Sequence, residues 1–454
     1  MPMPKASPKS SVDIAIVGAG ISGLTLAYAL KRRGRSLILL EQDSRVGGCI
    51  QSLQAQHYLA ELGPNSLFAP EPSPMLELLA DLKLAPMRSS RAHKNRYIYH
   101  QNRLQALPTG LLPFLRTPLL SASAKWRLLQ EPFVAASKMD DESVGNFFAR
   151  RLGAEVANNL IDPMITGIYA GDIWQLSMSA VFPKLAKAQQ QHGSLAKAAV
   201  AALYKKRGGH QTTHPQLWSV AGGLSALTQA LATQLADDLH LNYQVRHVSH
   251  QHGQWQIAGP DQSTIAAKSL VLATSLPSTL ALCRSLDDQL AAPLAQIPAL
   301  PIISVSLALP KQAINHPLDG FGFLVPTQAQ LKLLGVIWAS SIFPDRCPKD
   351  QALLTCMLAG ARAPELLHLD DERLLQLLNS DLQQTMGITS KPLWQTIKRW
   401  HQAIPQYTLG HAERINNLHA AAKAFPNLHF TGNYIDGLSV VHCVERAQQL
   451  AQTL

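Results

Sequence analysis

Charged and aromatic side chains are scarce in this chain of 454 residues, at 15% and 6% of the sequence. The hydrophobic share of 46% is high enough to bury a large core, which excludes a disordered or collagen-like protein. So few aromatic residues are unfavourable for stacking nucleic-acid bases, and we expect no nucleic-acid partner. No run of 18 apolar residues occurs either, so the sequence predicts no membrane-spanning helix.

Cysteine is rare as well: the five cysteines are odd in number and scattered, without a C-x-x-C pair. We therefore expect reduced thiols in a cytoplasmic protein, with no zinc site and no disulfide framework. The first 11 residues lack the apolar stretch of a signal peptide, which agrees with that expectation. The net charge of +10 favours an anionic partner, and does not choose among a substrate, a membrane surface and nucleic acid.

The chain opens with the pattern of a β-α-β unit. Residues 12–17 and 36–40 have the composition of buried strands, and residues 21–33 between them have helical spacing. The first turn is a G-x-G-x-x-G motif, made of Gly18, Ala19, Gly20, Ile21, Ser22 and Gly23. Such glycines occur in ordinary turns between a strand and a helix. They also allow a pyrophosphate to approach the positive end of the helix. Glu41, at the end of the second strand, can bind ribose hydroxyls, which argues against NADP.

Two further glycine motifs favour FAD over NAD. Arg45, Gly47 and Gly48 follow the second strand closely and suit a second contact with a dinucleotide pyrophosphate. Near the carboxyl end, Gly432 and Asn433 lead into a last helix, whose N-terminus can face a phosphate or a flavin ring. Each motif alone is equally typical of a structural turn. Together they favour non-covalently bound FAD in one site built from both ends of the chain.

The remaining pattern predicts a mixed α/β fold. Helical spacing dominates residues 108–204, and further helices are expected at residues 76–84, 223–235, 372–385 and 441–452. Strands are expected at residues 241–248, 254–258, 269–273, 302–309, 321–325, 334–339, 353–358 and 428–430. We expect a Rossmann-like FAD-binding domain formed by residues 1–90, 210–275 and 405–454. In this scheme residues 91–209 form a helical insertion, and residues 276–404 form a strand-rich insertion.

Motifs in other parts of the chain accompany the glycine motifs. They are E-L-G-P-N-S at residues 61–66, N-R-Y-I-Y at 95–99, A-L-P-T-G at 106–110, G-I-Y-A-G-D at 167–172, G-F-G-F-L-V-P at 320–326 and I-P-Q-Y-T-L-G-H at 404–411. The whole set resembles the FAD-dependent protoporphyrinogen oxidase family, within the flavin-containing amine oxidase superfamily. The resemblance covers nearly the full length of the chain.

The resemblance implies that residues 91–209 form a membrane-associating domain and that residues 276–404 form a substrate-binding domain. It also implies roles for particular residues. Arg96 would pair with a substrate propionate, Phe321 and Leu324 would clamp the macrocycle, and no catalytic acid or base is needed. The implied substrate residues are Arg96, Phe321, Gly322, Leu324, Met357, Gly167 and Ala170. The implied FAD residues outside the first glycine motif are Glu41, Gln42, Arg45, Gly47, Gly48, Cys49, Gly63, Pro64, Asn65, Ser66, Val245, Gly432, Asn433, Leu438, Ser439 and Val440.

The resemblance also implies an activity: oxidation of protoporphyrinogen IX to protoporphyrin IX in haem biosynthesis. Hydride equivalents would pass to the flavin and then to oxygen, giving hydrogen peroxide. Implied surroundings are the inner face of the cytoplasmic membrane, a homodimer and transfer of the product to ferrochelatase. Coproporphyrinogen III is an alternative substrate. An amine oxidase or carotenoid desaturase, and a porphyrin-binding flavoprotein without turnover, are further alternatives.

Four groups of residues have simpler explanations beside the functional ones. Arg96 lies among other basic residues, which alone would indicate a solvated face. His247, His250 and His252 lack a nearby carboxylate, so we expect no metal there. Residues 104–120, interrupted by three prolines, suit a membrane interface or an ordinary surface. The same two explanations apply to the basic residues of the helical stretch, Lys184, Lys187, Lys197, Lys205, Lys206 and Arg207.

Overall fold

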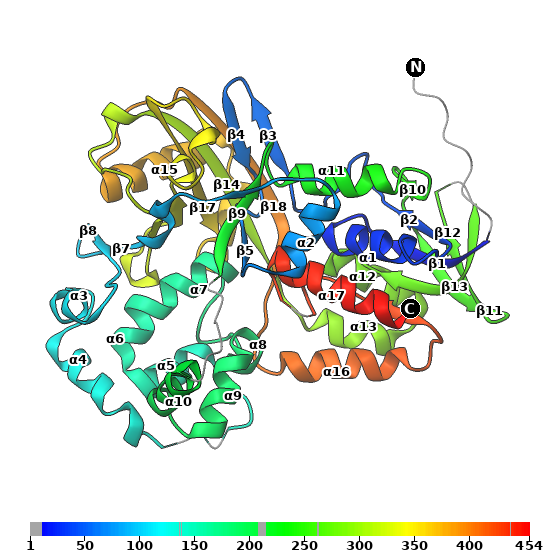
Figure 1. Ribbon diagram of the computed structural model, residues 1–454, viewed down its shortest axis with the longest axis horizontal. Helices are drawn as coiled ribbons and strands as arrows, with labels where there is room; N and C mark the ends of the chain where they lie inside the picture. Colours follow the sequence, from blue (N-terminus) through cyan, green and yellow to red (C-terminus); the bar gives the residue numbers. More distant parts are fainter. Residues whose placement is uncertain (1–10, 136, 138, 208–214, 261–262, 436) are drawn as a thin grey trace.

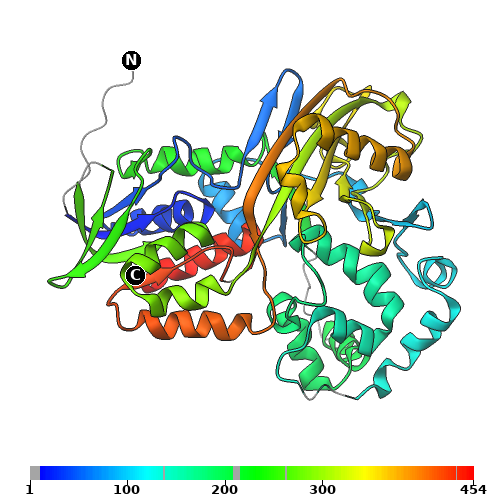
Figure 2. The same cartoon turned by 180° about the vertical axis from the view of Figure 1, so that it is seen from behind.

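The computed structural model describes residues 11–135, 137, 139–207, 215–260, 263–435 and 437–454, without the side chains of residues 202–207. Two seven-stranded sheets and a group of helices account for most of this part of the chain (Figure 1). The first sheet and its helices lie at one end of the molecule, and the second sheet lies at the other end, above the helical group. The view from behind shows the same separation (Figure 2).

The first sheet is mostly parallel and is built from distant parts of the chain. In spatial order its strands are β10 (Leu239–His240), β2 (Leu37–Leu40), β1 (Ser11–Val17), β13 (Thr264–Leu272), β12 (Gln254–Ala258) and β11 (His247–Gln251), with β19 (Leu428–Phe430) also paired to β13. Strands β10, β2, β1, β13 and β19 are parallel to one another, and β12 and β11 are antiparallel.

Helices cover both faces of this sheet, because alternate side chains of a strand point to opposite faces. Ile14 and Ile16 of β1 belong to one core, which also takes residues from α1 (Ile21–Lys31), α2 (Pro74–Asp81), α11 (Ser225–Gln234) and α17 (Val440–Thr453). Ala15 and Val17 belong to the opposite core, with α12 (Leu276–Leu286), α13 (Asp288–Ala295) and α16 (His411–Ala422). The three layers confirm the expected Rossmann-like fold.

The second sheet has one face on a helix and one face toward the rest of the molecule. Its order is β18 (Trp394–Pro405), β14 (Ala299–Pro310), β17 (Gln351–Ala359), β16 (Leu333–Ile337), β15 (Gly322–Leu324), β7 (Tyr97–His100) and β8 (Arg103–Ala106). Ile303 and Val305 of β14 pack with α15 (Asp371–Met386). On the other face, Met357 packs near Trp400 and Ala170.

The helical group lies between β8 and β9 in the chain. It comprises α3 (Leu111–Arg116), α4 (Ala122–Leu129), α5 (Val144–Leu152), α6 (Ala154–Val156), α7 (Asp162–Tyr169), α8 (Met178–Val181), α9 (Pro183–His192) and α10 (Leu195–Arg207). Ser121, Ser143 and Ser177 accept backbone N–H bonds at the starts of α4, α5 and α8, which explains where these helices begin. No helix in the described ranges has the length and apolarity needed to cross a membrane.

Two small sheets and a short helix complete the described structure. The sheets are the hairpin of β3 (Ser52–Ala55) and β4 (Tyr58–Glu61), and the set of β5 (Leu67–Ala69), β9 (Gln216–Val220) and β6 (Pro86–Arg88). The helix is α14 (Ala339–Ile342).

Three sequence-based expectations need correction. Residues 241–246 form no strand, because the N–H groups of Asn242 and Tyr243 turn back to the carbonyls of Asp43 and Glu41 at the end of β2. β7 pairs with β15 and β8 pairs with β7, so residues 97–106 belong to the second sheet and not to a helical insertion. Helices α12 and α13 pack on the first sheet. The strand-rich part expected at residues 276–404 therefore begins near β14 and not at residue 276.

Candidate functional site

A cavity of about 620 Å³ opens where the strands β1, β2, β13 and β19 end. Ligands of open α/β sheets bind at this carboxyl edge, outside the point where the strand order reverses. The expected cofactor residues that line the cavity are Gly18, Gly20, Ile21, Ser22, Glu41, Gln42, Arg45, Gly47, Gly48, Cys49, Pro64, Val245, Gly432, Asn433, Leu438 and Val440. The fold therefore brings residues from both ends and the middle of the chain to one cavity.

The three glycines of the first motif have different surroundings. Gly18 has a φ of +104°, and a Cβ on it would lie 2.7 Å from the carbonyl oxygen of Ala273. A Cβ on Gly23 would lie 1.9 Å from the carbonyl oxygen of Gly18, so glycine is needed for α1 to pack on the turn. A Cβ on Gly20 would meet no atom within 4 Å. Gly20 therefore leaves open space at the N-terminus of α1, where a pyrophosphate fits.

The Glu41 carboxylate is fixed at the end of β2. Its side chain is only 8% exposed and accepts hydrogen bonds from the N–H groups of Ala19, at 2.7 Å, and Asp43, at 3.0 Å. Glu41 also lines the cavity, where a carboxylate can accept hydrogen bonds from ribose hydroxyls. The turn, the helix N-terminus and this carboxylate together fit the adenosine diphosphate half of a dinucleotide.

Arg45 holds the second glycine motif in shape. Its guanidinium donates to the carbonyl oxygens of Gly48, at 2.7 Å, and Val46, at 3.3 Å. The N–H of Gly47 donates to the carbonyl of Ala19 at 2.8 Å, which docks the second motif on the first. Arg45 therefore shapes the turn while it also lines the cavity.

Some of the expected cofactor residues lie outside this cavity: Ala19, Gly23, Gly63, Asn65, Ser66 and Ser439. A Cβ on Gly63 would lie 2.0 Å from the carbonyl oxygen of Cys49, so Gly63 serves close backbone packing. Asn65 and Ser66 border a small hollow next to Phe321. The hydroxyl of Ser439 accepts the N–H of His442 at 3.1 Å and caps α17.

Sequence reasoning missed part of the cavity wall. Trp400 lines it from β18, and its indole N–H donates to the carbonyl of Leu62 at 2.8 Å. No short motif marks Trp400, because its place in the cavity wall depends on how the two sheets meet. The other residues missed include Asp43, Tyr243, Gln244, Arg246, Ala273, Thr274, Ser275, Leu276, Gln402, Ala403, Pro405 and Cys443.

The expected substrate residues gather on one face of the second sheet. Leu324, Gly335 and Met357 are cross-strand neighbours of β15, β16 and β17, so their side chains share a face. A Cβ on Gly167 would lie 2.5 Å from Cδ2 of Leu324, which places α7 directly against that face. We call this group, with Ala170, the apolar wall. It adjoins the cofactor cavity, since Met357 packs near Trp400.

Arg96 and Phe321 form a corner beside β7 and β15. The guanidinium carbon of Arg96 lies 5.1 Å from the centre of the Phe321 ring, a cation–π contact. The surrounding protein partly desolvates this guanidinium, which lowers the pKa of Arg96. Among the described residues no carboxylate pairs with it. Such a cation beside an aromatic ring suits a carboxylate of an otherwise apolar ligand.

Gly322, between Phe321 and the apolar wall, has a backbone role. Its φ is +141°, and a Cβ would lie 2.0 Å from the carbonyl oxygen of Val336. Glycine therefore allows β15 and β16 to approach closely, and Gly322 shapes the wall without offering a side chain to a ligand.

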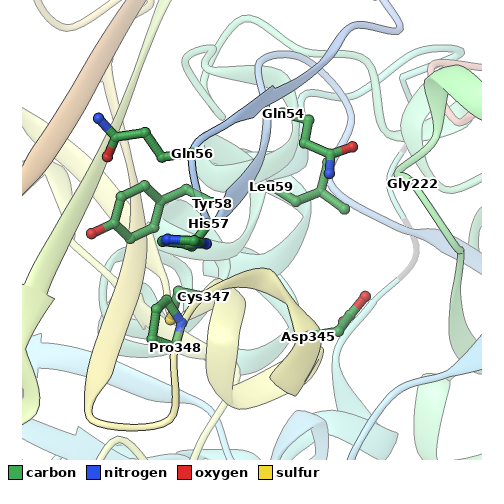
Figure 3. Close-up of a pocket in the computed structure, with 9 residues that line it drawn as sticks. All are labelled: Gln54, Gln56, His57, Tyr58, Leu59, Gly222, Asp345, Cys347 and Pro348. Carbon is green, nitrogen blue, oxygen red and sulfur yellow. The ribbon is translucent and has the colours of Figure 1, made fainter.

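A second depression, of about 580 Å³, lies beside the β3–β4 hairpin (Figure 3). Its side chains come from the hairpin, Gly222 and residues 345–348, and none of the expected site residues is among them. The histidines near β11 are placed separately: His250 packs against Trp255, with ring centres 5.2 Å apart. In the described ranges, no group of three or more His, Cys, Asp and Glu side chains could hold a metal ion.

A dinucleotide-sized cavity beside an apolar wall defines the class of protein: an oxidoreductase that holds a dinucleotide at a glycine-rich turn. The chain belongs to the flavin containing amine oxidoreductase family, which matches residues 21–454. It is therefore a flavoprotein, and the cavity described above accounts for FAD as its cofactor.

Relatives of known name cover nearly all of the chain. Coproporphyrinogen III oxidase of Bacillus subtilis is 28% identical over 96% of both chains. The chloroplastic protoporphyrinogen oxidase of Nicotiana tabacum is 31% identical over 98% of this chain and 85% of its own. The crystal structure of a protein described as a protoporphyrinogen oxidase from Exiguobacterium superposes with a TM-score of 0.83, 25% identity and coverage of 98% and 99%.

Proposed function

We propose that this protein oxidises a porphyrinogen to a porphyrin in haem biosynthesis, with protoporphyrinogen IX as the substrate. The observation that carries the proposal is the Arg96–Phe321 corner beside β15, the strand that also carries Leu324 of the apolar wall. That wall adjoins the cofactor cavity. A porphyrinogen combines a large apolar macrocycle with propionate groups, and this site offers an apolar surface beside Arg96, which no carboxylate pairs in the described part of the chain. The names of the relatives support the same substrate class.

FAD supplies a hydride acceptor when bound. The residues of this chain position the substrate and keep water away from it. Arg96 holds a propionate, Phe321 and Leu324 contact the macrocycle, and the apolar wall excludes water. No acid or base is needed, because pyrrole N–H protons can leave as imines form.

A side-by-side assay of the FAD-loaded protein on protoporphyrinogen IX and coproporphyrinogen III tests the proposal. Porphyrin fluorescence is followed against enzyme-free controls, because porphyrinogens also oxidise in air. We expect both rates to exceed the control, with a preference for protoporphyrinogen IX. A preference for coproporphyrinogen III, the substrate named for the Bacillus relative, would move the activity to a different step. No rate above the control on either would refute porphyrinogen oxidation.

We also propose that the protein rests on the inner face of the cytoplasmic membrane. Large apolar side chains are exposed on α3, on α4 and just after it, at the outer edge of the helical group in Figure 1. They are Leu111, Leu112, Leu115, Trp126, Leu129 and Phe133, and we call them the α3–α4 face. Exposed Lys184, Lys187 and Lys197 of α9 and α10 would add attraction to anionic lipid. The side chains of Lys205, Lys206 and Arg207 lie outside the described residues.

We further propose that oxygen reoxidises the flavin, that the protein forms a homodimer and that the product passes to ferrochelatase.

A further inference from the structure

Tyr407 lies on the segment that joins β18 to α16 and belongs to the core of the helical group. Its side chain is 3% exposed. Its hydroxyl donates to the carbonyl oxygen of Asn433 at 2.5 Å and accepts the N–H of Gly437 at 2.7 Å. One buried hydroxyl therefore joins Asn433 to Gly437, and we call the described residues 433–435 and 437 the Asn433–Gly437 turn.

This turn forms part of the cavity wall. Asn433 lines the cavity at one end of the turn, and Leu438 and Val440 line it where the turn enters α17. Tyr407 itself does not line the cavity. It can therefore affect the cofactor only through the turn, by fixing where these backbone groups lie.

Two aromatic rings pack against the ring of Tyr407. The ring of His411, from α16, stacks on it with centres 4.1 Å apart and planes 13° apart. The ring of Tyr169, from α7, meets it edge-on at 5.8 Å. The Tyr407 carbonyl accepts the N–H of Ser177 at 2.8 Å. Because the ring and its backbone are packed this closely, the hydroxyl has little freedom to leave the turn.

We propose that Tyr407 is a positioning residue for FAD, whose hydroxyl holds the Asn433–Gly437 turn in the arrangement that binds the cofactor. The two glycine motifs at the start of the chain take no part in these two hydrogen bonds. It stands on FAD binding and not on the identity of the substrate.

The test is FAD dissociation from the purified holoenzyme, measured as free flavin after dilution and filtration. Tyr407→Phe removes one oxygen atom and both hydrogen bonds, and we expect the FAD dissociation constant to rise about tenfold. Tyr169→Phe is the matched control, because it removes the same atom from the neighbouring ring, and its hydroxyl makes no bond to the described part of the turn. We expect this control to stay within about twofold of the wild type. An unchanged constant for Tyr407→Phe, or an equal rise in both variants, would overturn the proposal.

Amide exchange separates positioning from general destabilisation and also covers poor folding of the variant. In the wild-type holoenzyme the N–H of Gly437 should exchange slowly, because the Tyr407 hydroxyl accepts it in a buried position. In Tyr407→Phe it should exchange at least tenfold faster, while amides of β14 keep their wild-type rates. Fast exchange of Gly437 in the wild type would refute the hydrogen bond directly. A uniform rise over the whole chain in Tyr407→Phe would show a structural role instead.

Discussion

At the scale of single residues, glycines of the same motif have different roles: some leave room for a ligand and others allow close backbone packing. Gly20 faces open cavity, whereas Gly23 faces the backbone of Gly18. One position is kept small for the ligand and the other for the fold. The same distinction separates Cys49, which lines the cavity, from Gly63, which packs on its carbonyl.

Gly20→Ala should therefore affect mainly FAD binding, and Gly23→Ala should affect mainly the stability of the fold. We expect Gly20→Ala to weaken FAD binding by about tenfold or more, because its methyl group would occupy the space of a pyrophosphate. The free energy of unfolding of the flavin-free protein should change by less than about 0.5 kcal/mol. Gly23→Ala should lower that free energy by roughly 1–3 kcal/mol, because its Cβ meets a carbonyl oxygen. Urea unfolding and flavin titration measure both. Similar stability losses in the two variants would contradict this division of roles.

Arg96→Ala should weaken substrate binding without loss of flavin. The loss of a charge-assisted bond to a carboxylate is expected to raise KM for the porphyrinogen by roughly 10–100-fold. Arg103→Ala, an exposed arginine on β8, is the control and should leave KM unchanged. Steady-state kinetics and the flavin absorbance of the purified variants give the two readouts. An unchanged KM in Arg96→Ala would remove Arg96 as the carboxylate anchor.

At the scale of elements, α16 carries a buried histidine next to Tyr407. Burial lowers the pKa of His411 to about 4, and the charge of Arg414 acts in the same direction. The folded state therefore prefers the neutral ring. As the pH falls below 6.5, the ordinary pKa of histidine, His411 becomes protonated in the unfolded chain but stays neutral in the folded protein. Stability is present above pH 6.5 and is lost toward pH 4.

We expect His411 to contribute about 3 kcal/mol to the loss of stability between pH 6.5 and 4. His411→Phe keeps an aromatic ring against Tyr407 and removes the titrating group. Its free energy of unfolding should therefore fall less steeply over this interval than that of the wild type. Urea unfolding at a series of pH values checks the slope. Parallel curves for the two proteins would show that His411 does not set the acid sensitivity.

The exposed α3–α4 face gives an element-scale test of membrane attachment. Leu111 is 76% exposed and Phe133 is 89% exposed, so serine at both positions should leave the fold intact. We expect Leu111→Ser with Phe133→Ser to reduce binding to anionic lipid vesicles about tenfold. Leu377→Ser with Leu393→Ser, at exposed positions on the second-sheet side, is the control. Co-sedimentation with vesicles measures both variants, and equal binding would exclude the α3–α4 face.

At the scale of the whole molecule, a buried ion pair joins the hairpin of β3 and β4 to the second-sheet side. Glu61 is 4% exposed and Arg346 is 2% exposed, with Nη1 and Oε1 3.1 Å apart. Glu61 also accepts the N–H of Leu224 at 2.9 Å, and Arg346 donates to Ser219 at 2.6 Å. Burial raises the pKa of Glu61, while Arg346 opposes that rise. Arg346 therefore favours the charged form of the buried Glu61 carboxylate.

Arg346→Met should destabilise the protein by roughly 3–5 kcal/mol, because it leaves the Glu61 carboxylate buried without its partner. Lys332→Met is the control, since its pair with Glu365 is exposed and worth less than about 1 kcal/mol. Arg346→Met with Glu61→Gln should recover part of the loss. Denaturant unfolding gives all three values. A loss below about 1 kcal/mol in Arg346→Met would show that the pair does not hold the two parts together.

The sequence by itself determined the parts that depend on short spacing. The β-α-β unit, its glycine turn and Glu41 at the end of β2 follow from periodicity and backbone freedom within about 25 residues, and the structure places them around one cavity. The motifs that resemble a known family, such as the one containing Arg96 and the one containing Phe321, identified residues whose meeting no local pattern shows.

Only the tertiary structure decided which distant segments meet. Trp400 and residues 243–246 reach the cavity, and β7 and β8 join the second sheet, through contacts between segments more than a hundred residues apart. Glu61 and Arg346 are 285 residues apart in the chain, and the Tyr407 hydroxyl donates to the carbonyl of Asn433, 26 residues further on. Tyr407 belongs to the motif at residues 404–411, but the motif does not show this contact. Packing and hydrogen bonding set these positions, because the environment of a buried side chain is supplied by whatever segment lies against it.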